Sequence, residues 1–320
     1  MNELDISTTQ SPIKSKPIFG LGVVSGKGGV GKTMLTASLL YYLNNKGCKL
    51  FGLDCDVDAP NLGLLFKAEK VICKKTIQTT MKATFLNQNC VSCAKCIEDS
   101  YCNFQALLWD DVQKYPVIDQ YSCEGCGACE ELCASKAFKV VPVDSGTIEY
   151  ITTPFGFPLI TGETILGAST TGKLITELRK FATENAKMLG SELILLDGPP
   201  GIGCPVIASI SGLKYAIVIV EPTPTAIHDA KRVIGIINQL NIPFGIVINK
   251  ADSWESGRII IETYCRESEI EILGEIPVDF CIPESISAAV PVLAMKKSSP
   301  AITELEKIGA RVYEIVQQIH

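Results

Sequence analysis

The sequence predicts an α/β protein built on a doubly wound parallel sheet, with a small α+β domain inserted into it. Three observations lead to this prediction. A glycine-rich loop joins an apolar segment to one with helical spacing, and later in the chain apolar strands alternate with amphipathic helices. Between these two parts, eight cysteines fall into two tight sets. The expected division is a flexible extension over 1–17, a main domain made of 18–70 and 145–320, and an insert over 71–144.

Length and composition limit the possible classes. A chain of 320 residues, 47% hydrophobic and 20% charged, is long enough for one large core and a small second domain. The formal net charge of −6 argues against an extended nucleic-acid surface, because such surfaces use clustered Lys and Arg. Apolar runs such as 215–220 are too short to span a bilayer, and 1–17 lacks the apolar run of a signal peptide. We therefore expect a cytoplasmic protein without stable membrane insertion.

The apolar run 18–24 leads into a glycine loop, and helical spacing follows over 34–43. In this strand, loop and helix arrangement, backbone N–H groups and the positive end of the helix dipole favour a bound phosphate. Lys32 is expected to reach the β and γ phosphates, and the Thr33 hydroxyl to ligate Mg²⁺. The residues predicted to contact the nucleotide here are Gly26, Lys27, Gly28, Gly29, Val30, Gly31, Lys32, Thr33 and Met34.

A second strand, 50–53, delivers three carboxylates to the edge of the sheet where ligands bind. Asp54 and Asp56 are expected to support Mg²⁺ or to orient the water that attacks the γ phosphate. The alternative for both is helix capping and solvation, and this alternative is favoured for Asp58.

Two later strands also end in polar residues. Strand 193–196 ends at Asp197, expected to be a second carboxylate on the magnesium side, and Pro200 follows in a loop placed to sense the γ phosphate. A plain tight turn is the alternative. Strand 244–248 leads to Asn249, whose amide is a candidate for reading the base. Lys250 and Asp252 follow it, and the loop 278–283 after the strand near 271–277 is expected to cover the base. Helices are expected near 171–189, 225–240, 256–267 and 301–319, the last packing its apolar stripe on the domain.

Each cysteine set begins C-x2-C-x2-C, a spacing that lets three thiolates converge on one iron-sulfur cluster. Zinc and disulfides are the alternatives, but zinc sites usually pair C-x2-C units and disulfides belong to oxidising compartments. The pattern resembles two-cluster ferredoxins, in which the fourth Cys of each set ligates the other cluster. It departs from them at Asn103 and Ala134, where proline is usual, and in the wider spacing of Cys96 and Cys102. The implied ligand sets for two [4Fe-4S] clusters are Cys90, Cys93, Cys96 with Cys133, and Cys123, Cys126, Cys129 with Cys102.

The motifs together resemble a known family. The loop from Gly26 to Thr33 is similar to the deviant Walker A motif of the MinD/Mrp class of P-loop ATPases, and Asp54-x-Asp56 and Asp197-x-Pro-Pro-Gly are similar to its two switch motifs. The inserted cysteines narrow the resemblance to members with an inserted ferredoxin domain. The resemblance covers nearly everything from Ile18 onward.

The resemblance implies residue roles. Lys27 matches the signature lysine that reaches the partner's phosphates across a nucleotide-sandwich homodimer, and Asp56 matches the residue that positions the attacking water. With Lys32 and Asp197, these are the expected catalytic residues. Asn249-Lys250-Ala251-Asp252 also reads as the N-K-x-D motif of GTPases, but the deviant loop favours ATP. Cys204 lies at the offset of a cluster ligand in the nitrogenase iron-protein branch, yet we expect a small buried residue there.

Three functions use the same parts. The favoured one is ATP-gated electron transfer to a partner metalloprotein, because two complete four-cysteine sets suit stable redox centres. The first alternative is an ATP-driven carrier or assembly factor for iron-sulfur clusters or metallocofactors. The second is a MinD-like spatial organiser with structural clusters. The expected ligands are ATP, Mg²⁺ and two [4Fe-4S] clusters.

Overall fold

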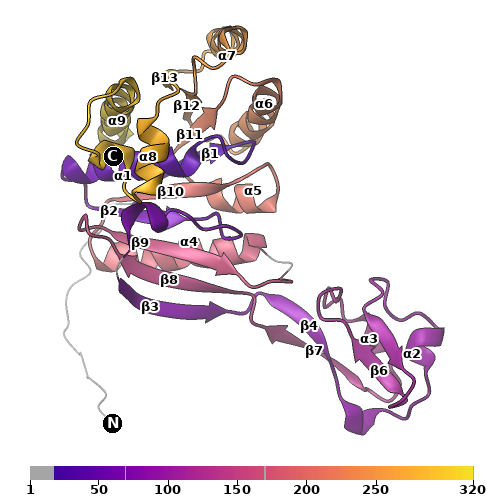
Figure 1. Cartoon of the computed structure of the whole chain (residues 1–320). Helices are drawn as coiled ribbons and strands as arrows, with labels where there is room; N and C mark the ends of the chain where they lie inside the picture. Colours follow the sequence, from indigo (N-terminus) through magenta and orange to yellow (C-terminus); the bar gives the residue numbers. More distant parts are fainter. Residues whose placement is uncertain (1–17, 69, 169–170, 320) are drawn as a thin grey trace, which may run out of the picture.

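The computed structural model describes residues 18–68, 70–168 and 171–319. Within them, one sheet of nine strands runs through the main body in the order β13-β12-β11-β1-β10-β2-β9-β8-β3 (Figure 1). The strands of this sheet are β1 (Phe19–Ser25), β2 (Leu50–Asp54), β3 (Lys70–Ile77), β8 (Gly146–Thr152), β9 (Pro158–Thr164), β10 (Leu193–Pro200), β11 (Tyr215–Val220), β12 (Phe244–Asn249) and β13 (Ile272–Ile276).

Neighbouring strands from β13 to β9 pair in parallel, whereas β9 with β8 and β8 with β3 pair antiparallel at one edge. Parallel neighbours require crossover connections, and helices between the strands provide most of them. The prediction of an α/β fold with a mostly parallel sheet is confirmed. The antiparallel edge was not predicted from the sequence.

Helices cover both faces of the sheet, with α8 and α9 on one side and α5 and α6 on the other (Figure 1). Strand side chains alternate between the two layers, so that Val23 packs in the core with α1 and α9 while Val24 packs in the core with α6. A third core joins α4 to β2 and β10. The helices of the main body are α1 (Lys32–Asn45), α4 (Thr171–Met188), α5 (Cys204–Ile210), α6 (Pro224–Gln239), α7 (Glu255–Glu267), α8 (Cys281–Ser287) and α9 (Pro300–Ile319), with short 3-10 turns at Leu64–Phe66 and Val292–Ala294.

The last helix, α9, packs on the main body as predicted. Its apolar stripe is buried from Ile302 to Val316, but Ile319 is 44% exposed, so the stripe ends a turn earlier than expected. The close approach of α9 to α1 depends on Gly309, because a Cβ there would lie 2.6 Å from Cγ of Tyr42. No helix among the described residues is both long and apolar enough to cross a membrane.

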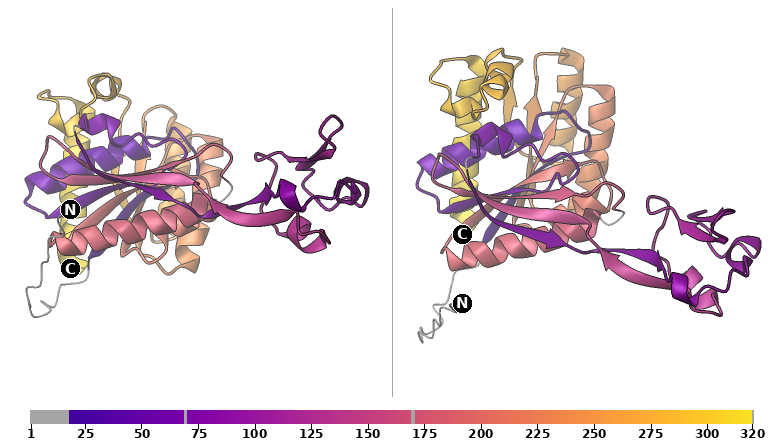
Figure 2. Two further views of the ribbon diagram at one scale, coloured as in Figure 1. Left: turned by 90° about the horizontal axis from the view of Figure 1, so that it is seen from below. Right: turned by 60° about the horizontal axis from the view of Figure 1, so that its bottom comes forward.

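The segment between β3 and β8 extends away from the main body as a narrow lobe (Figures 1 and 2). Both β3 and β8 belong to the large sheet, so the lobe leaves the sheet after Ile77 and returns at Gly146. Ser145 is buried at the root, where its hydroxyl donates to the Ile77 carbonyl (2.9 Å) and accepts from the Thr79 amide (2.7 Å). The elements of the lobe are β4 (Thr80–Phe85) paired with β7 (Phe138–Val143), β5 (Leu107–Asp110) paired with β6 (Tyr115–Ile118), α2 (Lys95–Glu98), α3 (Ala128–Leu132) and a 3-10 turn at Asn87–Asn89.

Two identical substitutions should have opposite effects on the free energy of unfolding. Gly235 lies in α6 with no heavy atom within 4 Å of an added Cβ, so Gly235→Ala should stabilise by about 0.5–1 kcal/mol through helix propensity. Gly309→Ala should instead destabilise by about 1–3 kcal/mol, because the methyl group would overlap Tyr42. Urea unfolding followed by far-UV circular dichroism measures both. Equal stabilisation by the two variants would contradict the close packing of α9 on α1.

Candidate nucleotide site and cysteine lobe

The glycine loop follows β1 directly and ends where α1 begins at Lys32. Gly29 and Gly31 have φ values of +78° and +99°, a region that favours glycine. A Cβ on Gly31 would also lie 2.5 Å from Nδ2 of Asn249. The loop therefore presents backbone at the N-terminus of α1, as phosphate binding requires. Met34 was predicted to contact the nucleotide, but its side chain is buried in the core, so only its backbone is suited to that role.

The first turn of α1 is joined to β10 through Asp197. Thr33 Oγ1 donates to Asp197 Oδ2 (2.7 Å), and Thr36 Oγ1 donates to Asp197 Oδ1 (3.0 Å). Lys32 is 6% exposed, and its burial lowers the pKa of its ammonium while Asp197 opposes that shift. The sequence did not single out Thr36, because a threonine inside a helix has no distinctive pattern.

Asp54, the last residue of β2, lies side by side with Asp197 of β10, and the two are paired across the strands. Both are almost completely buried, and burial raises the pKa of each carboxyl, that of Asp197 to about 6. Such a pair of buried carboxyls suits a cation, since a positive charge offsets the cost of ionising them. Together with the Thr33 hydroxyl, this oxygen-rich group fits the expected Mg²⁺.

Asp54 also organises the loop that follows β2. Its Oδ1 accepts from the Asp56 amide (3.1 Å) and its Oδ2 from the Leu62 amide (2.9 Å). Asp56 is half-buried and burial raises the pKa of its carboxyl, with Lys32 opposing the shift. Asp58 is exposed and accepts a hydrogen bond from Thr164 Oγ1 (2.8 Å), so it connects this loop to the end of β9.

The residues directly after Asp197 form part of a strand, where a loop was predicted. Strand β10 continues through Pro200, which is paired with Ser25 at the end of β1. Gly201 then turns with φ +99° and its amide donates to the Ser25 carbonyl (3.2 Å). The nearest heavy atom to a Cβ built on Gly28 is Cβ of Pro200, at 3.9 Å. Pro200 therefore lies against the glycine loop, although its strand extends beyond the predicted end.

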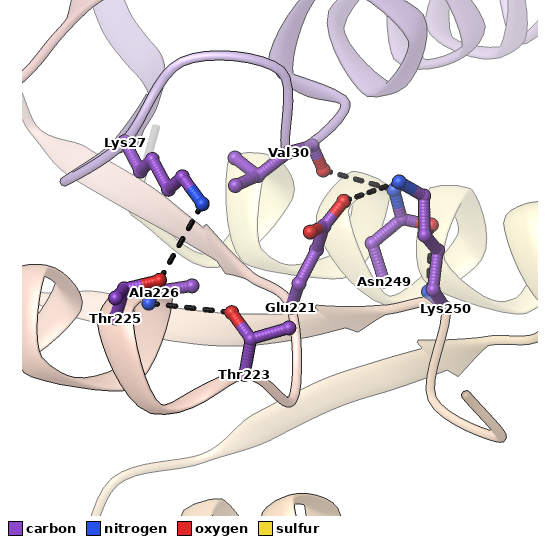
Figure 3. A network of polar contacts seen from close by, with 8 residues as sticks. All are labelled: Lys27, Val30, Glu221, Thr223, Thr225, Ala226, Asn249 and Lys250. Atoms are coloured by element: carbon purple, nitrogen blue, oxygen red, sulfur yellow. Dashed lines mark hydrogen bonds and ion pairs between the residues drawn. The ribbon is translucent and has the colours of Figure 1, made fainter. Parts of the chain in front are cut away.

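Lys27 lies at the outer side of the glycine loop, near the start of α6 (Figure 3). Its Nζ donates to Thr225 Oγ1 over a long 3.4 Å, in an exposed position. The neighbouring Thr223 caps α6 by accepting from the Ala226 amide (3.4 Å). Lys27 is thus held by one long hydrogen bond in an exposed position. Gly26 packs so closely on Asp229 that a Cβ would lie 2.3 Å from its backbone.

Asn249 uses its amide to hold backbone, a role that the sequence did not predict. Nδ2 donates to the Val30 carbonyl (2.9 Å), and Oδ1 accepts from the Lys250 amide (3.0 Å) (Figure 3). One donor hydrogen and one lone pair remain, so the amide retains only part of its capacity for a base. Its principal contact joins β12 to the glycine loop.

The side chains of Lys250 and Asp252 also have partners within the protein. Lys250 pairs with Glu221 (2.6 Å), a residue at the end of β11 that sequence reasoning missed (Figure 3). Asp252 Oδ1 accepts from the Val278 amide (2.7 Å), so this carboxylate holds the loop after β13. A cavity of about 350 Å³ lies between that loop and β12, lined by Asn249, Lys250, Pro277, Val278, Asp279, Phe280, Ile282, Pro283 and Ile286.

In the lobe, the eight cysteines gather into two groups of four. The distal set (Cys90, Cys93, Cys96, Cys133) lines a cavity of about 390 Å³. The proximal set (Cys102, Cys123, Cys126, Cys129) lines a much smaller one of about 20 Å³. These are the groupings that the ferredoxin resemblance implied. All fourteen cysteines of the chain are free thiols. Cys204 is exposed at the start of α5, so the expectation of a buried residue there is wrong.

The two sets share a backbone conformation. Ser92 and Ala94 have φ values of +52° and +55°, and the residues 33 positions later, Gly125 and Gly127, have +61° and +85°. Backbone amides also donate to thiol sulfurs in both sets, for example Ala137 to Cys133 (3.4 Å) and Ala106 to Cys102 (3.3 Å). Amide donors of this kind stabilise a thiolate that is bound to metal.

Among the described residues, no three His, Cys, Asp or Glu side chains are grouped so that they could hold a metal ion. A single ion needs all its thiolates within about 2.3 Å of one point. A four-iron cluster instead spreads its thiolates around a larger body, which suits the wider distal cavity. Burial raises the pKa of Cys129 to about 11, so its thiolate would need a cation beside it. The proximal cavity is much smaller, so its four cysteines would have to move apart to surround a cluster of this kind.

The raised pKa of Asp197 predicts how stability depends on pH. The folded carboxyl binds its proton up to about pH 6, whereas the unfolded value is about 3.9. This group therefore contributes stability below about pH 4 that is lost as the pH rises to about 6, by about 2–3 kcal/mol. Between pH 4 and pH 7, the free energy of unfolding of Asp197→Asn should rise by that amount relative to wild type. Urea unfolding without Mg²⁺ or nucleotide measures it. Asp111→Asn, at an exposed carboxylate, is the control. If the free energies of unfolding of wild type and Asp197→Asn depended on pH in the same way, the raised pKa of Asp197 would be refuted.

Comparison with known proteins agrees with this geometry. An uncharacterised protein of Methanocaldococcus jannaschii is 36% identical over 291 residues, covering 90% of this chain and 95% of the relative. An iron-sulfur cluster carrier protein of the same organism is 24% identical, covering 98% of this chain and 88% of the relative. Among solved structures, the septum site-determining protein MinD of Pyrococcus horikoshii with Mg-ADP has a TM-score of 0.60 at 17% identity, covering 95% of this chain and 99% of the other. Residues 21–292 match the family described as the CobQ/CobB/MinD/ParA nucleotide binding domain. The chain belongs to this family.

Proposed function

We propose that this protein is a dimeric ATPase whose lobe holds two four-iron clusters, and that nucleotide state controls electron transfer from the lobe to a partner metalloprotein. The observation that supports this best is the arrangement of the cysteines. Two sets of four thiols each surround their own cavity, with ligands drawn from both halves of the lobe. Complete four-thiol sets suit resident redox centres. In this proposal, the lobe between Ile77 and Gly146 is the ferredoxin-like insert of the ATPase domain. The predicted start at residue 71 is too early, because β3 (Lys70–Ile77) belongs to the large sheet.

The nucleotide side would use the residues around the glycine loop. Lys32 would contact the β and γ phosphates, and Asp56 would orient the attacking water. Thr33, Asp54 and Asp197 would hold Mg²⁺, which neutralises phosphate charge when bound. Lys27, weakly tied to Thr225, would reach the phosphates of a second subunit. Because such a clamp acts on charge that develops during transfer, it needs no covalent intermediate.

Two connections lead from this site to the lobe. Thr164, at the end of β9, is bonded to the loop after Asp56: its amide donates to the Val57 carbonyl (2.8 Å) and its hydroxyl to Asp58 (2.8 Å). The next residue, Ile165, donates from its amide to the carbonyl of Ser145 (3.0 Å), at the root of the lobe. A shift of the Asp56 loop would therefore act on the strands that enter and leave the lobe.

The second connection is a direct contact between the lobe and the main body. A Cβ added to Gly167 would lie 2.9 Å from Cδ1 of Tyr121, so the tyrosine ring lies on the backbone of the loop after β9. Tyr121 is two residues before Cys123, and Asp119 fixes this turn by accepting from the Tyr121 amide (3.0 Å) and from Ser122 Oγ (2.5 Å). The proximal set is therefore the one nearer the ATPase site.

The cysteine side chains would provide thiolate ligands, and the amide donors around them would stabilise the added negative charge. When bound, four-iron clusters supply one-electron chemistry at low potential. The protein's own contribution is to hold the two sets apart and to exclude water from the buried thiols Cys123 and Cys133.

Iron-sulfur cluster carriage is a second candidate. It is favoured by the similarity to the relative from Methanocaldococcus jannaschii that is named an iron-sulfur cluster carrier protein. It is also favoured by exposure, since one ligand of each set, Cys93 and Cys126, lies at the surface. An acceptor protein could approach a cluster at these positions.

The role of Lys27 can be tested by dimerisation. Lys27→Ala should still bind ATP, because Lys32 and the loop backbone remain, but should lose ATP-dependent dimerisation. Lys49→Ala, at an exposed lysine next to the opposite end of β2, is the matched control and should dimerise like wild type. Analytical ultracentrifugation with and without MgATP measures the change. Persistent dimerisation of Lys27→Ala would remove the lysine from the subunit interface.

The electron-transfer function is tested by following electrons and iron together. Anaerobic, dithionite-reduced protein is mixed with cytochrome c or with an apo-ferredoxin, with and without MgATP. We expect MgATP to change the rate of cytochrome reduction by about tenfold, corresponding to about 1.4 kcal/mol of barrier, while iron stays on the protein. Iron appearing in the apo-ferredoxin at the same nucleotide dependence would favour carriage instead.

The contact between the lobe and the main body supplies a variant for the same assay. Tyr121→Ala should keep its iron but lose most of the nucleotide dependence, because it removes the ring that lies on Gly167. Val112→Ala, at a lobe residue that is 91% exposed, should behave like wild type.

A further inference from the structure

A lysine is buried beside the proximal set without an anionic partner. Lys82, on β4, is 5% exposed, and its Nζ donates to the carbonyl of Cys123 (2.6 Å). That acceptor is neutral, and the ion pair of the described lobe joins Lys114 to Asp111 instead. Burying an ammonium group against a neutral carbonyl is costly unless negative charge lies near it.

Neighbouring charges supply little of that compensation. Asp119 is half-buried, and the pKa of its carboxyl is lowered first by hydrogen bonds from Ser122 and Tyr121 and only weakly by Lys82. Glu124 lines the proximal cavity but is exposed, so solvent screens its charge. The buried ammonium group of Lys82 would therefore stabilise further negative charge at the proximal set.

The contact also holds a predicted cluster ligand in place. Next to Lys82 in β4, the Ala83 amide donates to Cys123 Sγ (3.4 Å), so one strand binds both the carbonyl and the sulfur of the same cysteine. The distal set has no equivalent among the described residues. The lysine that lines its cavity, Lys95, is exposed, and Tyr115 stands 33 residues after Lys82, at the repeat offset of the cysteines.

We propose that Lys82 is the counter-charge of an anionic iron-sulfur group on the proximal set, and that it makes this group the more easily reduced of the two. The inference rests on the proposed function. A fixed positive charge in a poorly solvated site favours the reduced form, which has one more negative charge. One electron would thus pass from the distal to the proximal group, with no bond made or broken, and a low-potential one-electron donor would replace it. Electrons would then collect at the set that Tyr121 places against the ATPase body.

The test is an EPR-monitored redox titration of anaerobic, iron-loaded full-length protein with dithionite and mediators. Lys82→Met should lower the midpoint potential of one centre and leave the other unchanged, whereas Lys82→Arg should restore it. Lys82→Gln keeps a hydrogen-bond donor without the charge and should behave like Lys82→Met. Lys139→Met, at an exposed lysine on the paired strand β7, should shift neither potential. A Cys126→Ser variant identifies the signal of the proximal centre.

Several outcomes decide the matter. Unchanged potentials in Lys82→Met and Lys82→Gln, with about eight irons per chain, would overturn the role of Lys82 and leave the proposed function intact. Wild-type protein without iron or labile sulfide would overturn both. If the neutral variants lose iron, retention in Lys82→Arg supports the counter-charge, and equal loss in Lys82→Arg rejects it.

Discussion

The side-by-side burial of Asp54 and Asp197 is the constraint on which the rest of the structure depends. Two buried carboxyls paired across neighbouring parallel strands need protons or cations around them. Lys32 and Thr33 lie beside them because the glycine loop starts α1 at the same place. Asp54 also determines the path of the next loop through two amide hydrogen bonds. A change in the charge of Asp54 would therefore alter the hydrogen bonds that hold the loop containing Asp56.

The Asp56 loop is also connected to the edge of the sheet from which the lobe extends. The antiparallel strands β8 and β3 extend the parallel sheet beyond β9, and the lobe grows from their ends. Thr164 ends β9 and bonds to Asp58, while Ile165 bonds to the root at Ser145. These hydrogen bonds connect the Asp56 loop to the root of the lobe within a few residues of β9.

The lobe is a repeat whose halves are chemically unequal. The cysteine loops share their positive φ positions, yet only the proximal half combines a buried lysine with a contact to the main body in the described structure. A repeat places two similar sites at a fixed separation, and differences in neighbouring charge can then tune them differently. In our proposal, this difference directs electrons from the distal set towards the proximal set.

The sequence by itself determined the glycine loop, the parallel α/β core and the 33-residue repeat of cysteines, because each depends on local spacing along the chain. Ser92 and Gly125, for instance, occupy matching turns that short-range geometry requires. Only the tertiary structure showed that Asn249 and Asp252 bind the backbone of distant loops. It also showed which partners Lys82, Tyr121 and Thr164 contact. These residues act through partners far away in sequence, and a lysine, tyrosine or threonine has no pattern of neighbours that reveals whether it is buried. Long-range packing decided their environment, and the environment decides their chemistry.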